Sequence, residues 1–312
     1  MQKRRTCNLR GRLFTSSIQR KKAIEGYLFA SPWFIGFFLF TVGPMVISLV
    51  MSFYNYDVLT PPKFVGLENY KTLFTGDPLF WKVLYNTFYY AVFQIPSYLV
   101  VSLAVAVLMN QQVPGIRIFR TLYYLPAVTA GPATMMLWLW LFDPSMGLIN
   151  QVLWAIGIDN TPLWLQSEVW SKPSLILMSL WYAGSSMVIY LAGLQGIPQE
   201  LYDAAAVDGA GSWTQFRKIT LPMLSPTIFF NLIMGIINAF QIFEQAYLMT
   251  EGGPMNSTLF YALYLYYNAF KWLKMGYASA LAWVLFAIIL VLTLIQFKLA
   301  NRWVYYEAAD RG

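Results

Sequence analysis

The chain has 312 residues, of which 58% are hydrophobic, 18% aromatic and only 11% charged. A soluble domain carries about a quarter charged residues, so this composition excludes an ordinary water-soluble fold. Histidine is absent and Cys7 is the only cysteine, which excludes histidine-based catalysis, a metal site built on His or Cys, and a disulfide within the chain.

Long apolar runs dominate the sequence. A helix needs about 20 mostly apolar residues to cross about 30 Å of hydrocarbon. These runs are far longer than barrel strands, and lipid leaves unpaired backbone groups unsatisfied, so only helices suit them. We therefore predict an all-α, polytopic membrane protein. Its six predicted transmembrane helices lie at residues 27–53, 86–109, 122–142, 174–194, 226–249 and 277–299. A basic segment, 1–26, precedes this membrane domain (27–299), and a short tail, 300–312, follows it.

The net charge of +7 is distributed unevenly between the two sides of the membrane. Six crossings place residues 1–26, 110–121, 195–225 and 300–312 on one side. With Lys298, that side holds 15 of the 21 lysines and arginines, including all ten arginines. Basic residues favour the cytoplasmic side, so we predict that both termini and the 195–225 loop are cytoplasmic. The surplus indicates topology and contact with anionic lipid, and it gives no support to nucleic-acid binding.

Two outer stretches are not predicted to span: the long connection 143–172, and residues 259–270, which are too short at twelve residues. Residues 143–172 mix turn signals with Trp154, Trp164 and Trp170, and residues 259–270 read LFYALYLYYNAF. Tryptophan and tyrosine are enriched at the membrane–water boundary, so we expect both stretches to lie at the membrane interface.

The polar segment 199–222, QELYDAAAVDGAGSWTQFRKITLP, separates the fourth and fifth predicted spans. Good helix formers predict a helix over residues 199–207. Gly209 and Gly211 permit a sharp reversal, and Ser212 is a candidate cap for a second helix over residues 213–219. Two short helices at a fixed angle would form a compact knob on the cytoplasmic face. Leu201, Tyr202 and Trp213 would fill an apolar notch in a partner, and Asp203 would meet a basic residue.

The spacing inside this segment is specific. The motif comprises Asp203-Ala204-Ala205, Gly209 after three residues, and Ile219, Leu221 and Pro222 after nine more. It resembles the "EAA" loop of permease subunits of bacterial ATP-binding-cassette (ABC) importers of the carbohydrate type, with aspartate where glutamate is commoner. Further similar stretches are FVGLENY at 64–70, Asn86-Thr87, FEQAYLMTEGGP at 243–254 and RWVYYE at 302–307.

The resemblance implies the type I permease fold, a bacterial inner-membrane location and a non-enzymatic role in carbohydrate import by alternating access. It implies that residues 199–222 couple this chain to two ATPase subunits, which bind the ATP and Mg²⁺. A second, unlike permease subunit and an extracytoplasmic solute-binding protein complete the implied assembly. No G-x-x-x-x-G-K-[ST] loop occurs here, in agreement with ATP hydrolysis elsewhere. The residues implied to couple are Leu201, Tyr202, Asp203, Ala204, Ala205, Gly209, Ile219, Leu221 and Pro222.

Polar side chains form stripes on the two spans that flank this segment. Asn231, Asn238, Gln241 and Gln245 fall within an arc of about 80° at about 100° per residue, and Gly235 lies beside them. Ser179, Tyr182 and Ser186 share one face of the fourth span. Amides, hydroxyls and aromatic rings suit a sugar, so we predict that both stripes line the substrate pathway. The alternative is that these groups bond helix to helix.

Glu244 is the only acid that this topology buries, and it is included among the pathway residues. It could pair with Lys271 or Lys274, cap the pathway or contact a sugar hydroxyl. Glycerol-phosphate or another sugar-like solute remains an alternative cargo. A channel would need an Arg-rich span or a filter loop, and a secondary transporter a coupling acid, for which Glu244 is the one candidate.

Overall fold

The computed structural model describes residues 17–305, so parts of the two predicted terminal segments lie outside the described residues. Within that range the chain is helical except for one short ladder, in which β1 (Tyr54–Asn55) pairs antiparallel with β2 (Lys63–Phe64). Five helical stretches are long and apolar enough to cross a membrane: Arg20–Met51, Phe80–Met109, Ser171–Gln195, Ser225–Met249 and Met275–Ala300. They coincide with five of the six predicted spans.

The third predicted span is present as two consecutive helices and not as one continuous helix. Residues 122–142 are divided between α5 (Ile116–Val128) and α6 (Gly131–Leu141), and Thr129 and Ala130 between them are extended. Pro132 accounts for the break. It has no N–H to donate to the carbonyl four residues earlier, and its ring would collide with that carbonyl in a continuous helix.

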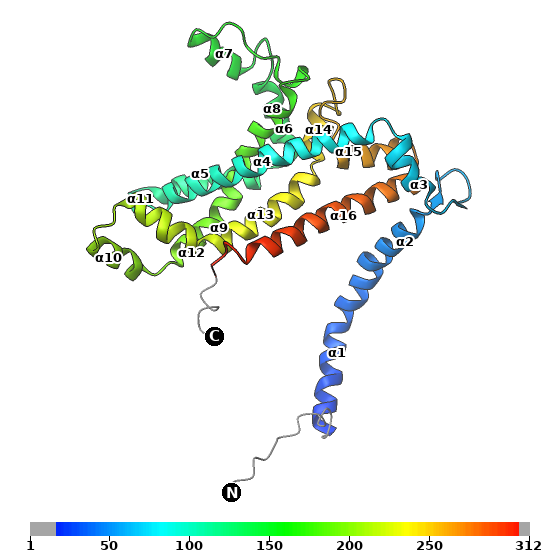
Figure 1. Ribbon diagram of the computed structural model, residues 1–312, viewed down its shortest axis with the longest axis horizontal. Coiled ribbons are helices and arrows are strands. Elements are labelled where there is room, and N and C mark those ends of the chain that lie inside the picture. Colours follow the sequence, from blue (N-terminus) through cyan, green and yellow to red (C-terminus); the bar gives the residue numbers. More distant parts are fainter. Residues whose placement is uncertain (1–16, 306–312) are drawn as a thin grey trace.

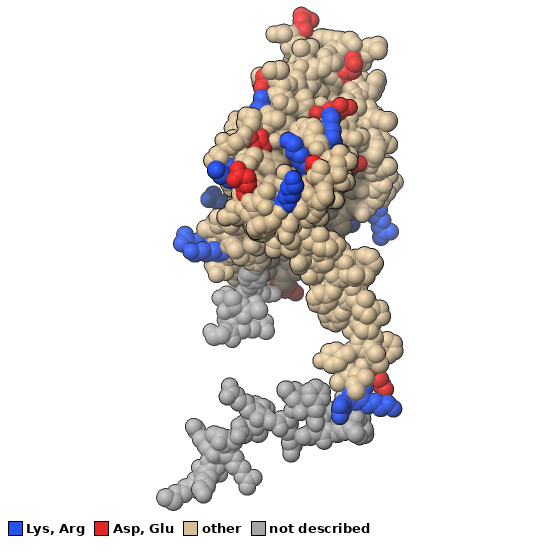
Figure 2. Space-filling model, turned by 90° about the vertical axis from the view of Figure 1, so that its right-hand side faces the viewer, with Lys and Arg blue, Asp and Glu red and all other residues tan. Residues whose placement is uncertain are grey.

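The first span diverges from the rest of the protein. It consists of α1 (Ser17–Phe37), a π-helical turn (Phe38–Val42) and α2 (Gly43–Met51). Only the end formed by α2 approaches the bundle (Figure 1). No residue in its most apolar window is buried. Figure 2 shows it as an uncharged arm with charged side chains gathered at its far end. This chain therefore leaves the apolar faces of α1 to lipid or to another protein.

The bundle is organised around α4 (Phe80–Met109), which runs its full length as one helix. It packs most extensively against α9 (Ala183–Gln195) and α13 (Ser225–Phe240), and α13 in turn packs on α16 (Met275–Ala300). Shorter elements complete this part of the chain. They are α3 (Glu68–Lys71), the π-helical turn Thr72–Gly76, α7 (Leu148–Ala155), the 3-10 turn Trp164–Gln166, α8 (Ser171–Ser179), α14 (Glu244–Met249), α15 (Tyr261–Tyr266) and the π-helical turn Tyr267–Lys271.

Segment 199–222 lies at one end of the bundle, which we call the inner end (Figure 1). It contains α10 (Gln199–Val207), α11 (Ser212–Gln215), a π-helical turn (Phe216–Thr220) and α12 (Leu221–Met223). The end with α3 and α15 is the outer end. A large apolar cluster fills the outer half of the bundle, and a smaller one joins α4, α9 and segment 199–222 at the inner end.

Most of residues 259–270 are buried in the bundle, which their composition did not predict. Tyr261 and Leu263 of α15 are fully buried in the outer cluster. Tyrosine can be buried when its hydroxyl finds a partner, and the Tyr261 hydroxyl donates to the carbonyl of Leu281 at 3.0 Å. Trp164 is buried for the same reason, because its Nε1 donates to Asn150 Oδ1 at 2.7 Å. Trp154 and Trp170 are exposed, as expected of interface residues.

Candidate functional site: a polar cavity and a coupling segment

All nine predicted pathway residues line a single cavity of about 630 Å³. The cavity lies between α4, α9 and α13, at the level where the fifth span is interrupted between Phe240 and Glu244. From α8, α9 and the 3-10 turn between them (Leu180–Tyr182) come Ser179, Tyr182 and Ser186. The fifth span supplies Asn231, Gly235, Asn238, Gln241, Glu244 and Gln245. Two stripes read from separate spans therefore face one space.

The cavity has a third wall that the sequence reading missed. Tyr90, Gln94 and Tyr98 of α4 line it, together with Ser185 of α9. Their spacing of four residues is a signal that could have found them, because residues four apart lie on neighbouring positions of one helix face. The two predicted stripes lie on the spans that flank segment 199–222, whereas this wall belongs to the second span.

Hydrogen bonds divide the lining into fixed and available groups. Asn231 is buried and its Nδ2 donates to the Thr227 carbonyl at 2.9 Å, while Ser179 Oγ donates to the Ile176 carbonyl at 2.6 Å. The Tyr98 hydroxyl lies 2.9 Å from both the Tyr182 carbonyl and Ser185 Oγ. Asn238 and Gln241 are exposed to the cavity instead. These two amides have the best access to a ligand.

Gly235 faces the cavity and also lies against α4. A Cβ added there would lie 3.4 Å from Ile95 Cγ2, an ordinary van der Waals contact. The packing of α13 on α4 would therefore accept a small side chain at this position.

Glu244 begins α14, and its carboxylate lies against the start of α6. A Cβ placed on Gly131 would be only 2.6 Å from Glu244 Oε1. Negative charge is favourable at a helix N-terminus because of the helix dipole. Among residues 17–305 the one ion pair joins Lys82 to Glu168 at 3.7 Å, so Glu244 is not paired with Lys271 or Lys274. The Lys271 ammonium lies over the Tyr267 ring instead.

The coupling segment, as we call residues 199–222, has the two-helix form predicted for it. Helix α10 has the predicted bounds, and Gly209 after it adopts φ +79°, a left-handed conformation that favours glycine. The second helix begins at Ser212 with Gly211 in the N-cap position, and the Ser212 side chain makes no capping hydrogen bond. The prediction that Ser212 caps this helix is therefore wrong.

The two faces of the coupling segment differ in exposure. Tyr202 is turned toward its own chain, and its hydroxyl lies 2.9 Å from Thr220 Oγ1, joining α10 to the second helix. Ile219 and Leu221 are half-buried beside it. The outward face presents Leu201, Ala204 and Pro222 with Asp203, whose carboxylate accepts a bond from Gln199 Nε2 at 3.1 Å. Val207 (89% exposed) and Trp213 (72%) are the most exposed apolar groups here, and Val207 was missed.

Long apolar helices, a polar cavity between them and an exposed helical segment at one end define a transport protein of the membrane. The family described as "Binding-protein-dependent transport system inner membrane component" matches residues 79–305, and the chain belongs to this family. It is thus a multi-pass inner-membrane transport component and not an enzyme. No group of three acidic or cysteine residues among residues 17–305 could hold a metal ion.

Similar curated proteins cover nearly the whole chain. The "Probable ABC transporter permease protein YesP" of Bacillus subtilis (strain 168) is 47% identical over 93% of this chain and 95% of its own length. The "Lactose transport system permease protein LacF" of Rhizobium radiobacter is 36% identical over 92% and 97%. The "Arabinooligosaccharides transport system permease protein AraP" of Bacillus subtilis (strain 168) is 33% identical over 90% of each chain.

Two solved structures share the fold. One is a chain of a bacterial ABC transporter that imports the acidic polysaccharide alginate; it has a TM-score of 0.80 and 24% identity over 92% of this chain and 99% of its own. The other is the bacterial alginate transporter in complex with its alginate pentasaccharide-bound periplasmic protein. It has a TM-score of 0.78 and 25% identity over 91% and 96%.

Proposed function

We propose that this chain is the transmembrane subunit of an ATP-driven carbohydrate importer and forms half of its translocation pathway. The observation that carries the proposal is the central cavity, where amides from three helices converge with tyrosine rings. An amide both donates and accepts hydrogen bonds, which matches the hydroxyl groups of a sugar. Aromatic rings offer apolar faces to the C–H groups of the same ligand.

The charge of the cavity favours a neutral cargo. Glu244 is the one charged side chain in its lining, and no lysine or arginine contributes. A phosphate group desolvated there would have no basic partner from this chain, and burying an unpaired charge is costly. This favours an uncharged carbohydrate over glycerol-phosphate.

The proposed assembly contains a second, unlike permease, two ATPase subunits, and an extracytoplasmic protein that delivers the sugar. The apolar faces of α1 that this chain leaves uncovered are consistent with contact to lipid or to the second permease. The outward face of the coupling segment, with Asp203, Val207 and Trp213, offers charge and apolar area to an ATPase. Closure of the ATPases on ATP would push on this segment and switch the cavity between outward-facing and inward-facing forms.

We also propose that the inner end is cytoplasmic. The basic residues at or next to that end are Arg117 and Arg120 in the first half of α5, Arg217 and Lys218 in the coupling segment, and Arg302 just after α16. Basic residues concentrate on the cytoplasmic side of membrane proteins. The sequence places further basic residues in both termini, on the same side.

Charge reversal in the coupling segment tests the proposal. The double change Asp203→Lys and Gly209→Pro should reduce ATP-driven sugar uptake by more than about tenfold, because truncating or reversing a central interface charge costs several kcal/mol. It should also abolish co-purification of the ATPases.

The matched control is Asp208→Lys, which places the same charge at an exposed position of the same segment outside the motif. Its uptake should stay close to that of the unmodified transporter. Normal uptake and normal ATPase recovery in the double variant would refute the coupling role.

A further inference from the structure

A second polar pocket, of about 740 Å³, lies at the inner end and has no role in the function proposed above. We call it the inner pocket. One wall is formed by the inner ends of α4 and α9 and the residues that follow them, including Asn110, Gln112 and Gln195. The coupling segment forms the other wall, with Gln199 and Gln215. The pocket therefore lies between a part that is proposed to move and the bundle that it moves against.

The lining of the inner pocket repeats the chemistry of the central cavity. Five amides face the inner pocket, and five face the cavity, where they belong to Gln94, Asn231, Asn238, Gln241 and Gln245. Each site adds aromatic rings, which are those of Tyr202 and Phe216 in the inner pocket. The two volumes, about 740 and 630 Å³, are also similar. A ligand suited to one site is suited to the other.

Charge narrows the class of ligand further. None of the residues that line the inner pocket carries a charge, so an ion bound there would lose hydration without gaining a partner. Two amides are partly engaged, since Gln199 Nε2 donates to Asp203 and Gln215 Nε2 donates to the Ala210 carbonyl at 3.1 Å. Asn110, Gln112 and Gln195 are exposed, and their amides can exchange water for ligand hydroxyls.

We propose that the inner pocket binds a neutral, polyhydroxylated molecule on the cytoplasmic side, namely the carbohydrate that the transporter has imported, and that this binding slows further import. This inference rests on the proposed function for the identity of the ligand. A molecule that bridges Gln195 and Gln215 would hold the coupling segment against α9. The bound molecule would favour the arrangement in which the coupling segment lies against α9. It would therefore shift the conformational equilibrium toward this arrangement and delay the next transport cycle.

Cysteine labelling tests whether the pocket binds sugar without any need for transport. The change Gln195→Cys is made in the assembled transporter with Cys7 replaced by serine, in proteoliposomes whose coupling side faces outward. The rate of labelling by N-ethylmaleimide is measured with and without lactose, maltotriose or arabinotriose. At least one sugar should slow labelling by about tenfold when present at about ten times its Kd, by simple competition.

Two further variants sharpen this test. Gln112→Cys, on the same wall of the pocket, should be protected by the same sugar as Gln195→Cys. Thr214→Cys, which is exposed on the coupling segment outside the pocket, should label at an unchanged rate. The proposal is overturned if none of the three sugars protects Gln195→Cys, or if Thr214→Cys is protected equally.

Uptake into vesicles preloaded with the protecting sugar tests the regulatory part. The preload should slow import by the unmodified transporter, and the double change Gln112→Leu with Gln195→Leu should restore the initial rate. Equal slowing of both would overturn the regulatory role. If a sugar protects Gln195→Cys but no sugar is taken up, carbohydrate import is refuted and the binding site in the inner pocket stands. If sugar is taken up but none protects Gln195→Cys, carbohydrate import stands and the binding site is refuted.

Discussion

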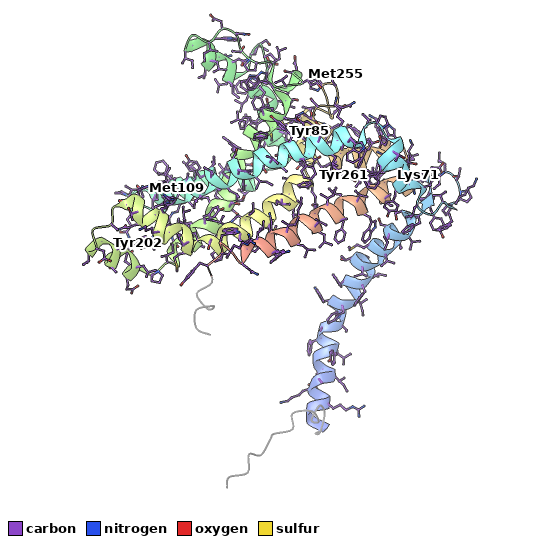
Figure 3. The ribbon with its side chains drawn as sticks, viewed as in Figure 1. Lys71, Tyr85, Met109, Tyr202, Met255 and Tyr261 are labelled. Carbon is purple, nitrogen blue, oxygen red and sulfur yellow. The ribbon has the colours of Figure 1, made fainter. Side chains whose placement is uncertain are left out.

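The two ends of the bundle are held together in different ways. At the outer end, buried bonds join segments that are distant in sequence. Asn86 Nδ2 donates to the carbonyls of Asn256 and Leu259 at 2.8 and 3.2 Å, and Thr87 Oγ1 accepts from the backbone N–H of Tyr261 at 2.9 Å. The carboxylate of Asp77 accepts from the hydroxyls of Tyr264 and Tyr277. In Figure 3, Tyr261 lies inside this end of the bundle, between α4 and α16.

The inner end is tied more sparsely. Its apolar cluster is small, and the hydroxyls of Ser102 and Tyr190 are buried there without a hydrogen-bond partner among the described residues. The outer cluster has one such atom, Trp138 Nε1. The contacts between the inner elements include Arg120, whose Nε and Nη2 both donate to the Met109 carbonyl, and the Tyr202 hydroxyl beside Thr220 Oγ1. Met109 and Tyr202 lie at this end of the bundle in Figure 3. The comparison teaches that the outer end is built as a fixed body, whereas the inner end can be rearranged at low cost.

The largest expected effect comes from the outer end. Asn86→Ala leaves the carbonyls of Asn256 and Leu259, of which the second is buried, and the Lys172 ammonium that donates to Asn86 Oδ1, without this partner. Each such loss costs about 1–3 kcal/mol, so the free energy of unfolding should fall by about 4 kcal/mol. Denaturant unfolding of the purified transporter measures it. Gln112→Ala, an exposed amide of the inner end, is the control and should cost less than about 0.5 kcal/mol.

The second-largest effect is expected at Gly184, where α9 packs closely against α5. A Cβ on Gly184 would lie 1.9 Å from the backbone oxygen of Tyr123, so Gly184→Ala must push the two helices apart. Overpacking of this kind costs about 1–3 kcal/mol. If α5 is free to shift relative to α9, the rate of sugar uptake should fall strongly while the free energy of unfolding falls only by this amount. Gly26→Ala, with open space around its Cβ, is the control, and a stability loss as large as that of Asn86→Ala would contradict the comparison.

The central cavity lies between the two ends, and Gln241→Leu probes it alone. Loss of one cargo hydrogen bond of about 1 kcal/mol should raise the KM for sugar uptake about fivefold, with unfolding unchanged because Gln241 is exposed. Gln151→Leu, an exposed glutamine on the outer helix α7, should leave KM as it is. An unaltered KM in both would remove Gln241 from the pathway.

The smallest effect is expected at the tether inside the coupling segment. Tyr202→Phe leaves Thr220 Oγ1, which belongs to a buried residue, without this partner, at a cost of about 1 kcal/mol. We expect uptake to fall by several-fold while the unfolding midpoint moves little. Thr220→Val should reproduce the result, and the double variant should add nothing further if the hydrogen bond is the cause.

Much of this architecture follows from patterns that one sequence displays. The apolar runs located five helices, three of them to within about three residues at each end and two with starts six or seven residues late, because hydrocarbon thickness fixes the length of a span. The polar stripes located two walls of the cavity, since the helical period puts residues three and four apart on one face. Pro132 is visible in the sequence as a possible break, but the apolar run continues through it and does not show that one helix ends and another begins there.

Other features depend on contacts that a local pattern does not contain. Residues 259–270 have the composition of an interface segment, and only the bonds of Tyr261 to α4 and α16 decide that they are core. Tyr202 and Val207 lie on one short helix, and its packing against Thr220 decides which of them faces outward. The sequence left the partner of Glu244 open among a lysine, the pathway and a sugar hydroxyl, and the fold brings its carboxylate to the start of a helix that is distant in sequence.

Three of the spans are interrupted, and these interruptions indicate a second role for the cavity besides binding the cargo. Span three is broken at Thr129 and Ala130, span five before Glu244, and span four tightens into a 3-10 turn at Leu180–Tyr182. Each irregularity frees backbone N–H or C=O groups, and hydrocarbon offers these groups no partner. The irregular residues of spans four and five, among them Tyr182, Gln241 and Ile242, line the cavity, where water and amides can solvate such groups. The polar space thus acts as the solvent in which these helices can be broken, and replacing its amides with leucine should favour straighter helices as well as weaker sugar binding.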